Sequence, residues 1–553
     1  MDLPFSVWLR LRWTLAQVLL LIAGLLAWLL RPLRKLAIPP AVVVALPQDR
    51  PSLTRTAATV RARADYDLVR IADKLDMHVD WGHRTVRAVP SPERYPLTML
   101  PPKWMLLAAL KVPLHGDRRW WTPEQPASAC FPLRQPASAR HWDDDLWFAA
   151  QRLQGPNPLF LEGVGDLERL DRLQLRGAVT GDPARLYAVD YRPMLRGCTP
   201  APGRSLPPCV ALFEATSDGL VPRLIQVESQ DGPPVVFRPD GTDAWRLGRL
   251  YFGAADMLVH EVVAHYQWTH VLGETLAIVT ARNLPWEHPL RGLLAPHLRG
   301  TLMQNANAAP LLVADGGLFD RCFAGGDCKH RLLEWGAANW SWERMILPRA
   351  IAGRGLEGLE DMPYRDDALL LWDAITAYVR GFVELWYDAD RLRGDQELRS
   401  WSQELHDALG TPLAEDRETL IELLSGVVFN PVAHNLVNAP QYDTFGFPMG
   451  SPVALHVPVP TRPEDVDRDM LLRALPHTGD SLQATRATWG FTLQYDRFGR
   501  HLEPPLPAGS PALVSDLRDA LAHAEETILT RNAGRRFEYL AALPSRVGNS
   551  VDA

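Results

Sequence analysis

The chain is poor in cysteine, and this limits the kinds of site that it can build. Five cysteines are spread over 553 residues, too few and too scattered for a disulfide scaffold or a cysteine-rich zinc site. In an oxidising compartment, Cys198 could pair with Cys209 and Cys322 with Cys328. Free buried thiols are the better expectation for so sparse a set.

Long runs of one charge are also missing. The net charge is −7 at pH 7 and no extended basic stretch is present, so we expect no nucleic-acid partner. Beyond residue 60 the sequence has no second linker, repeat or low-complexity tract. It therefore predicts an N-terminal segment, residues 1–60, and one large domain, residues 61–553, in a protein that we expect to be a monomer.

The N-terminal segment contains an uncharged and strongly apolar run, Trp13–Leu30. As a helix it would span about 27 Å, close to a bilayer core of about 30 Å. Basic residues flank it on both sides, which favours a membrane anchor over a cleaved signal peptide and leaves the orientation open. A surface-lying helix and a core helix are the alternatives. Residues 31–60 are rich in proline and predict an irregular linker.

Helical periodicity dominates the second half of the sequence. Apolar residues recur at helical spacing in four segments, 245–282, 366–388, 416–438 and 512–532. Strand patterns are sparse, and the best are at 184–191 and 222–229. The sequence thus predicts a mainly α fold, a large helical domain with small β-sheets.

The signatures of hydrolases are absent. No nucleophile elbow is present, and the stretch HEVVAHYQWTH, residues 260–270, only resembles a zinc-protease motif. That motif requires histidines at positions i and i+4 so that both face one metal. Ala264 stands where the second histidine would be needed, so the zinc-protease interpretation fails.

The histidines of this stretch are instead five residues apart, at His260, His265 and His270. On a regular α-helix, five residues advance about 500°, which leaves successive rings about 140° apart. A π-type insertion with i to i+5 hydrogen bonds would bring them onto one face, and such insertions gather at functional sites. Unrelated structural histidines are the alternative interpretation.

A second pair, His434 and Asn438, lies four apart in a helical run and needs no distortion to share a face. Asparagine is a weak, neutral ligand through its amide oxygen. Taken alone, this segment is equally typical of a histidine near a helix end and a capping asparagine.

Jointly, the spacing His-x4-His, a distant His-x3-Asn and the ending GNSVDA resemble the lipoxygenases. Residues 245–302 follow the central segment of that family almost position by position, including Trp245 and Asp256. Further matches follow in order at 151–158, 186–191, 317–326, 363–375 and 531–553. The resemblance covers residues 100–553 and implies the helical catalytic domain of the family.

The resemblance implies a site for one non-haem iron, with manganese as the second choice. Imidazole, amide and carboxylate ligands without thiolate suit these metals. The tail departs from the family pattern, because Gly548 replaces the usual proline and alanine replaces the terminal isoleucine. A main-chain carboxylate can still bind, although alanine anchors the tail with less apolar area. The implied ligands are His265, His270, His434, Asn438 and the carboxylate of the last residue, Ala553.

Three further residues are implied to orient the ligands, namely His260, Glu261 and Gln441. His288 and His297 match the family as structural residues. The resemblance also implies substrate-binding roles for Ala308, Leu312 and Phe319, with core packing as the alternative for the last two.

The identity of residue 308 bears on stereochemistry. Alanine there accompanies an S product in the family, and one methyl group can block an oxygen path where packing is tight. Asn307 replaces an arginine that meets the substrate carboxylate in some relatives, so the binding direction stays open.

The implied activity is dioxygenation of polyunsaturated fatty acids that contain a cis,cis-1,4-pentadiene. A ferric hydroxide would take a hydrogen atom and dioxygen would add to the radical, so no catalytic side chain is expected. A hydroperoxide isomerase or lyase, or a non-catalytic membrane-anchored lipid-binding relative, are the alternatives. The N-terminal β-barrel of plant and animal relatives has no counterpart in this sequence, and we expect the apolar helix to replace it in membrane association.

Overall fold

The computed structural model describes residues 44–49, 53–94, 135–230, 232–491, 497–499 and 510–551, together with the single residues 18, 22, 119 and 122. The predicted membrane helix, Trp13–Leu30, and the predicted ligand Ala553 therefore lie outside the described residues. Within that helix only Val18 and Ile22 are described; both are helical and exposed.

The core of the molecule is one continuous helical rod made of three consecutive elements, α10 (Asp243–Val259), η7 (His260–Val271) and α11 (Leu272–Asn283). The side chain of Thr242 caps its start by accepting a hydrogen bond from the backbone N–H of Trp245. Nearly every residue of the rod is buried. A helix that is apolar on all faces belongs in the centre of a large domain.

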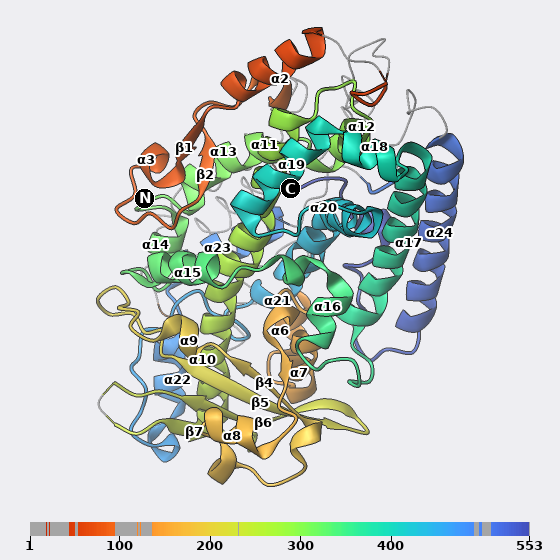
Figure 1. Cartoon of the computed structure of the whole chain (residues 1–553). Helices are drawn as coiled ribbons and strands as arrows, with labels where there is room; N and C mark the ends of the chain where they lie inside the picture. The colour runs from red at the N-terminus through yellow and green to blue at the C-terminus, as the bar shows by residue number, and fades with distance from the viewer. Residues whose placement is uncertain are drawn as a thin grey trace.

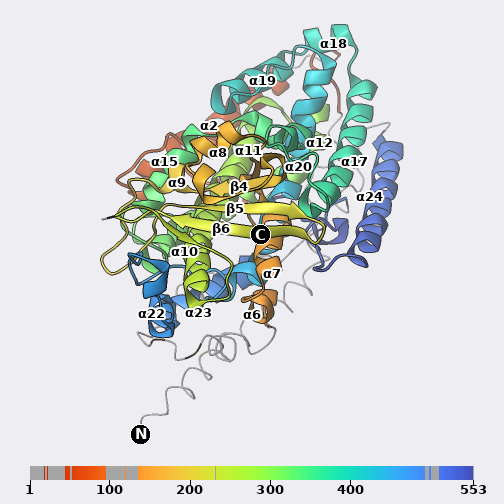
Figure 2. The ribbon, with the colours of Figure 1, turned by 90° about the horizontal axis from the view of Figure 1, so that it is seen from below.

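Further long helices surround this rod. Helix α20 (Arg417–Asn438) packs against η7 and α17 (Pro363–Trp386), and α17 also packs against α24 (Ser510–Asn532). Helices α17 and α24 lie side by side on one flank (Figures 1 and 2). These elements confirm all four predicted helical segments and the mainly α fold class.

The remaining helices are shorter. Those that pack against the rod are α2 (Leu53–Asp65), α12 (Pro289–Leu298), α13 (Thr301–Leu312), α15 (Cys328–Ala338), α19 (Gln396–Leu409) and α22 (Arg468–Ala474). The others are α3 (Ile71–Leu75), α6 (Ala137–His141), α7 (Asp145–Gln154), α8 (Leu167–Arg172), α9 (Arg192–Leu195), α14 (Leu318–Cys322), α16 (Leu347–Ala352), α18 (Ala389–Gly394), α21 (Gln441–Phe445) and α23 (Thr478–Phe491).

A five-stranded antiparallel sheet packs against α7 and α10 at one end of the molecule (Figure 1). Its strands, in both chain and spatial order, are β3 (Glu162–Gly163), β4 (Leu186–Asp190), β5 (Cys209–Thr216), β6 (Gly219–Val227) and β7 (Val235–Phe237). The two predicted strands correspond to β4 and β6. Strand β5 escaped prediction because its first five residues are all buried, so the alternation of a half-exposed strand is missing.

A buried polar network holds the rod against the sheet. Asp256 of α10 pairs with Arg152 of α7 at 2.8 Å, and accepts hydrogen bonds from Tyr191 and Asn157. Each of the four side chains is at least 97% buried. Because the carboxylate is paired and hydrogen-bonded, its burial is compatible with a stable core.

The N-terminal linker is shorter than predicted. Residues 53–60 belong to α2, which packs against α11. Arg55 of α2 is buried and binds both carboxylate oxygens of Glu397 at 2.6 Å. This ion pair and the absence of proline after Pro51 explain why the helix begins earlier than composition indicated. A two-stranded sheet follows, β1 (Leu68–Arg70) with β2 (Arg84–Val86).

The cysteines and the apolar helices of the described residues bear on two further points. Cys198, Cys209, Cys322 and Cys328 are all free thiols, as the sparse cysteine content favoured. One stretch of the described chain, Arg417–Phe445, is long and apolar enough to cross a membrane, but 83% of its most apolar window is buried inside the protein. It is a core segment, and it contains His434, which is described below.

Candidate metal centre

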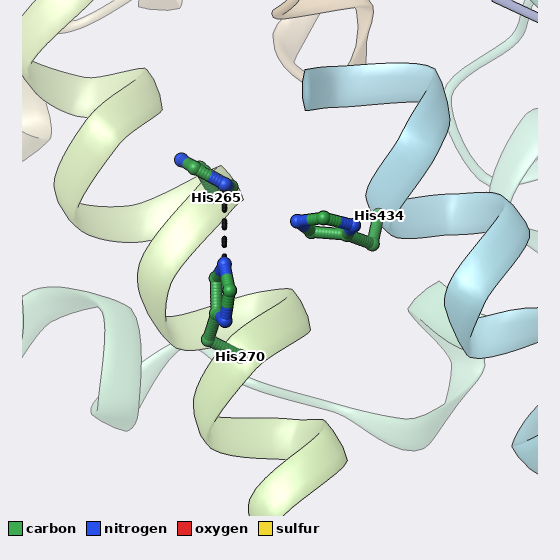
Figure 3. Close-up of side chains that lie close together, drawn as sticks. All are labelled: His265, His270 and His434. Carbon is green, nitrogen blue, oxygen red and sulfur yellow. Dashed lines mark hydrogen bonds between the residues drawn. The ribbon is translucent and has the colours of Figure 1, made fainter. Parts of the chain in front are cut away.

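Three buried histidines converge between the central rod and α20. His265 and His270 project from η7 and His434 projects from α20, so that the rings face a common space (Figure 3). The Nε2 atoms of His265 and His270 are 3.3 Å apart. One nitrogen from each of the three rings lies within 4.8 Å of the other two.

The convergence depends on a π-helix over His260–Val271, the distortion that the five-residue spacing requires. The backbone N–H of Leu272 bonds to the carbonyl of Gln267, five residues earlier. The hydroxyl of Thr269 donates to the carbonyl of His265, which adds a bond at the widened turn. Since five residues now complete about one turn, His265 and His270 share a face.

Glu261 orients His265 from one turn earlier on the same helix. Its Oε2 lies 3.1 Å from Nδ1 of His265. Burial alone would raise the pKa of Glu261, but hydrogen bonds from His260 and His265 outweigh it and lower the pKa to about 2. Burial also lowers the pKa of His265. A neutral ring that donates Nδ1–H to a carboxylate leaves Nε2 free for a metal.

Asn305 of α13 performs the same task for His270, and the sequence reasoning missed it. Its Nδ2 donates to the carbonyl of His270 at 2.9 Å and to Glu274 at 3.0 Å. Its Oδ1 must therefore accept, and Nδ1 of His270 lies 3.0 Å away. The proton of His270 is thus held on Nδ1, which directs Nε2 to the shared space.

This network continues to the two-stranded sheet of β1 and β2. Glu274 accepts a hydrogen bond of 2.5 Å from Thr85 and lies 3.4 Å from His83. Burial raises the pKa of Glu274, but the bonds from His83, Thr85 and Asn305 lower it below its ordinary value. An ionised Glu274 accepts from the amide of Asn305 and so fixes its orientation. Thr85 of β2 therefore supports His270 indirectly, through Glu274 and Asn305.

The amides of Asn438 and Gln441 link α20 to His265. Gln441 Nε2 donates to Oδ1 of Asn438 at 2.8 Å and lies 3.4 Å from Nδ1 of His265. Asn438 Nδ2 donates to the carbonyl of Phe491 at 2.6 Å. This bond orients the amide so that its oxygen, the atom able to bind a metal, points away from Phe491.

The other predicted histidines have structural partners. Nε2 of His260 lies 3.1 Å from the carbonyl of Val437 and so ties η7 to α20. His288 bonds to the buried Asp395 at 3.0 Å, and Nδ1 of His297 bonds to the carbonyl of Asn549 at 3.2 Å.

The C-terminal tail reaches the helix that carries the ligands. Val551 is fully buried. A Cβ atom on Gly273, three residues after His270, would lie 2.9 Å from the amide nitrogen of Asn430 and 3.4 Å from Cγ2 of Val551. The tail therefore lies at ordinary van der Waals distance from α11, and the close contact that favours glycine at position 273 is with Asn430 of α20. Ala553, two residues further on, lies outside the described residues.

The three predicted substrate residues lie on two consecutive helices near the centre. Ala308 and Leu312 are on α13, and Phe319 is buried on α14. Ala308 is one helical turn from Asn305, which contacts His270. Cavities of about 530 and 290 Å³ lie next to Trp268 of η7, and neither of these two is lined by the three residues.

The residues present fit a transition metal. Metal–nitrogen bonds of about 2.1 Å at angles of 90–109° place neighbouring ligand nitrogens about 3.0–3.4 Å apart, and the His265–His270 separation of 3.3 Å falls in that range. The donor set contains imidazoles and oxygen groups but no thiolate, which suits iron or manganese. The centre also has the oriented partners that metal-binding histidines require.

Comparisons with known proteins agree with this geometry. The family model "Lipoxygenase" matches residues 234–475. Polyunsaturated fatty acid lipoxygenase ALOX12 from Homo sapiens is 30% identical over 442 residues, which cover 74% of this chain and 66% of that protein. The ALOX15 protein from Homo sapiens is 28% identical over the same shares. The chain thus spans about two thirds of the length of these curated relatives.

Solved structures show the same fold. A calcium-dependent 11R-lipoxygenase has a TM-score of 0.83 at 23% identity, covering 93% of this chain and 83% of that chain. Coral 8R-lipoxygenase has a TM-score of 0.81 at 22% identity, covering 92% and 83%. With the family model, the curated relatives and the fold in agreement, the chain belongs to the lipoxygenase family.

Proposed function

We propose that this protein dioxygenates polyunsaturated fatty acids with a cis,cis-1,4-pentadiene to hydroperoxides, using one non-haem iron. The observation that carries the proposal is the buried convergence of His265, His270 and His434, two of them supported by oriented hydrogen-bond partners. Asn438 and the carboxylate of Ala553 complete the proposed ligand set. Bound there, iron would supply the one-electron chemistry that removes a hydrogen atom from the substrate.

The protein side of this chemistry is positioning. Glu261 and Asn305 hold protons on the Nδ1 atoms of His265 and His270, so that both Nε2 atoms are available. All three rings are at least 94% buried, which keeps bulk water from a reactive lipid radical. Gln441 connects His265 with Asn438, and we assign it the role of coupling the ligands to the substrate side.

The substrate side is proposed to be formed by Ala308, Leu312 and Phe319. Helix α13, which carries Ala308 and Leu312, also carries Asn305, the partner of His270, and α14 follows it in the chain; this supports the placement. We propose an S hydroperoxide, because the Ala308 methyl group would hinder oxygen on one face of the radical. A similar relative, from Rattus norvegicus, is named a (12S)/(13S)-lipoxygenase. An Ala308→Gly variant should shift the product toward R, as measured by chiral chromatography.

Membrane association is proposed from the apolar run at residues 13–30. Removal of residues 1–35 should release a monomeric protein from liposomes while leaving its iron content unchanged. If the truncated protein binds liposomes as well as the full chain does, the proposed anchor is wrong.

The activity is tested by incubating the iron-loaded protein with linoleic and arachidonic acids. We expect conjugated-diene absorbance and one oxygen molecule consumed per product. His434→Ala should abolish both, whereas His523→Ala, an exposed control on α24, should not. Repeating the reaction under low oxygen separates a dioxygenase from a hydroperoxide isomerase or lyase. Absence of diene with either acid would overturn the proposal.

A further inference from the structure

A second group of side chains that could hold a metal ion lies outside the three-histidine centre. We name it the Asp315 cluster, and it consists of His78, Asp315 and His330. Asp315 Oδ2 is 2.6 Å from Nδ1 of His78, and Oδ1 is 2.7 Å from Nε2 of His330. One ligand atom from each residue lies within 4.8 Å of the other two.

The cluster joins three separate parts of the fold. His78 lies in the loop between α3 and β2, Asp315 in the turn between α13 and α14, and His330 on α15. The His330 side chain is 4% exposed and that of His78 is 66% exposed. One side of the cluster is therefore fixed in the protein, and the other is open to an ion from solvent.

The protonation states of Asp315 and His330 favour binding of a cation by the cluster. Asp315 accepts hydrogen bonds from His78, Lys329 and His330, which outweigh burial and hold its pKa well below the ordinary value. Burial lowers the pKa of His330. The centroids of the two rings are 4.1 Å apart, so two imidazolium charges would repel. The cluster therefore offers a carboxylate and at least one neutral imidazole at neutral pH.

Lys329 competes for Asp315 but has an alternative partner. Its ammonium group is 3.2 Å from Oδ1 of Asp315 and 2.8 Å from Oδ2 of Asp320. The closer contact to Asp320 remains if Asp315 turns to bind an ion. The lysine would then neutralise Asp320 alone, and no buried charge is left unpaired.

We propose that the Asp315 cluster is a second metal site, which binds zinc or a similar divalent transition metal. Two imidazoles and one carboxylate with an open fourth position form a common zinc donor set. Tetrahedral bonds of about 2.0–2.1 Å place ligand atoms about 3.3 Å apart. The nitrogen–oxygen distances of 2.6 and 2.7 Å must therefore widen by about 0.6–0.7 Å. Movement of His78, which is exposed in a loop, supplies this on one side, and a turn of the Asp315 side chain supplies it on the side of the buried His330.

The Asp315 cluster lies close in sequence to the proposed substrate residues. Asp315 lies three residues after Leu312 and four before Phe319. An ion bound there would connect the turn between α13 and α14 to the loop between α3 and β2, which carries His78. This consequence rests on the proposed function, whereas metal binding itself does not.

The test is zinc titration of the iron-loaded full chain, followed by calorimetry and metal analysis. We expect one zinc equivalent beyond the iron, and a cobalt-substituted sample should show the visible absorption of tetrahedral Co²⁺. His78→Ala and Asp315→Asn should each weaken zinc binding at least ~10-fold, the smallest loss typical even for residues that only support ligands. His523→Ala is the matched exposed control.

Two outcomes would overturn the proposal. One is that no zinc binds beyond the iron equivalent, and the other is that His78→Ala and Asp315→Asn both bind zinc as the parent protein does. Because His78 is exposed in a loop, its variant should fold even if Asp315→Asn does not. His434→Ala should retain this zinc equivalent, which separates failure of the second site from failure of the iron proposal.

Discussion

Asn305 offers the sharpest test of how the metal centre is held. Asn305→Ala removes the bonds to His270 Nδ1, the His270 carbonyl and Glu274. The ring of His270 would then no longer have its proton fixed on Nδ1. Loss of such a supporting partner typically lowers metal affinity ~10–100-fold, which corresponds to about 1.4–2.8 kcal/mol.

The same substitution also destabilises the metal-free fold. Two neutral hydrogen bonds and one to a carboxylate contribute about 3–5 kcal/mol together. Asn283→Ala is the matched control, because Asn283 is equally buried, bonds to Val279 and Glu404, and accepts from Arg63. Asn283 ends α11, in the rod that also carries His265 and His270, and it has no hydrogen bond to the three histidines among those described above.

The assay compares both variants with the parent protein in two measurements. Denaturant unfolding of the metal-free proteins should show losses of similar size in both variants. Competition with a chelator should show weaker iron binding in Asn305→Ala alone. If both variants bind iron equally tightly, the role assigned to Asn305 is refuted and it is merely a buried structural residue.

Three further predictions concern other buried residues, Gly273, Gln441 and Asp395. Gly273→Ala should cost about 1–3 kcal/mol of unfolding free energy and weaken iron binding, because its Cβ would lie 2.9 Å from the Asn430 amide; unchanged stability would contradict this. Gln441→Leu should retain iron but lower kcat ~10-fold by removing the hydrogen bond that Gln441 donates to Asn438, as a diene assay would show. Asp395→Asn should flatten the acid limb of a pH–stability curve. Burial raises the pKa of Asp395, but its hydrogen bonds outweigh burial and lower the pKa below 3.8. Its contribution to folding stability is therefore present above pH 3.8 and is lost as the pH falls through the lower pKa of the folded state. Parallel acid limbs in the variant and the parent protein would refute this.

The sequence indicated the condition under which the histidines at five-residue intervals could share a face, namely a distorted helix. Element η7 has that distortion. The periodicity of α17, α20 and α24 was also clear. These features were predictable because helical spacing is a local property of the chain.

What the sequence could not show is how distant segments support the ligands. Asn305 is 35 residues from His270, and no local pattern marks an amide that bonds to a ring on another helix. Thr85 and His83 contact Glu274 across about 190 residues. A lone asparagine or threonine has no signature of its own, so such partners emerge only from tertiary packing.

Strand β5 and helix α2 were missed for a related reason. Burial on both faces removed the alternation from β5, and the ion pair between Arg55 and Glu397 stabilises a helix that composition assigned to a linker. Signals that depend on tertiary partners override local composition in both places.

The most direct test of the central claim is the rate of conjugated-diene formation from linoleic acid as a function of iron occupancy. We predict a rate proportional to bound iron, with a plateau at one iron per chain, and no activity in His434→Ala at any iron concentration. A rate independent of iron, or an iron-loaded protein that forms no diene, would contradict the assignment of His265, His270 and His434 as the catalytic metal centre.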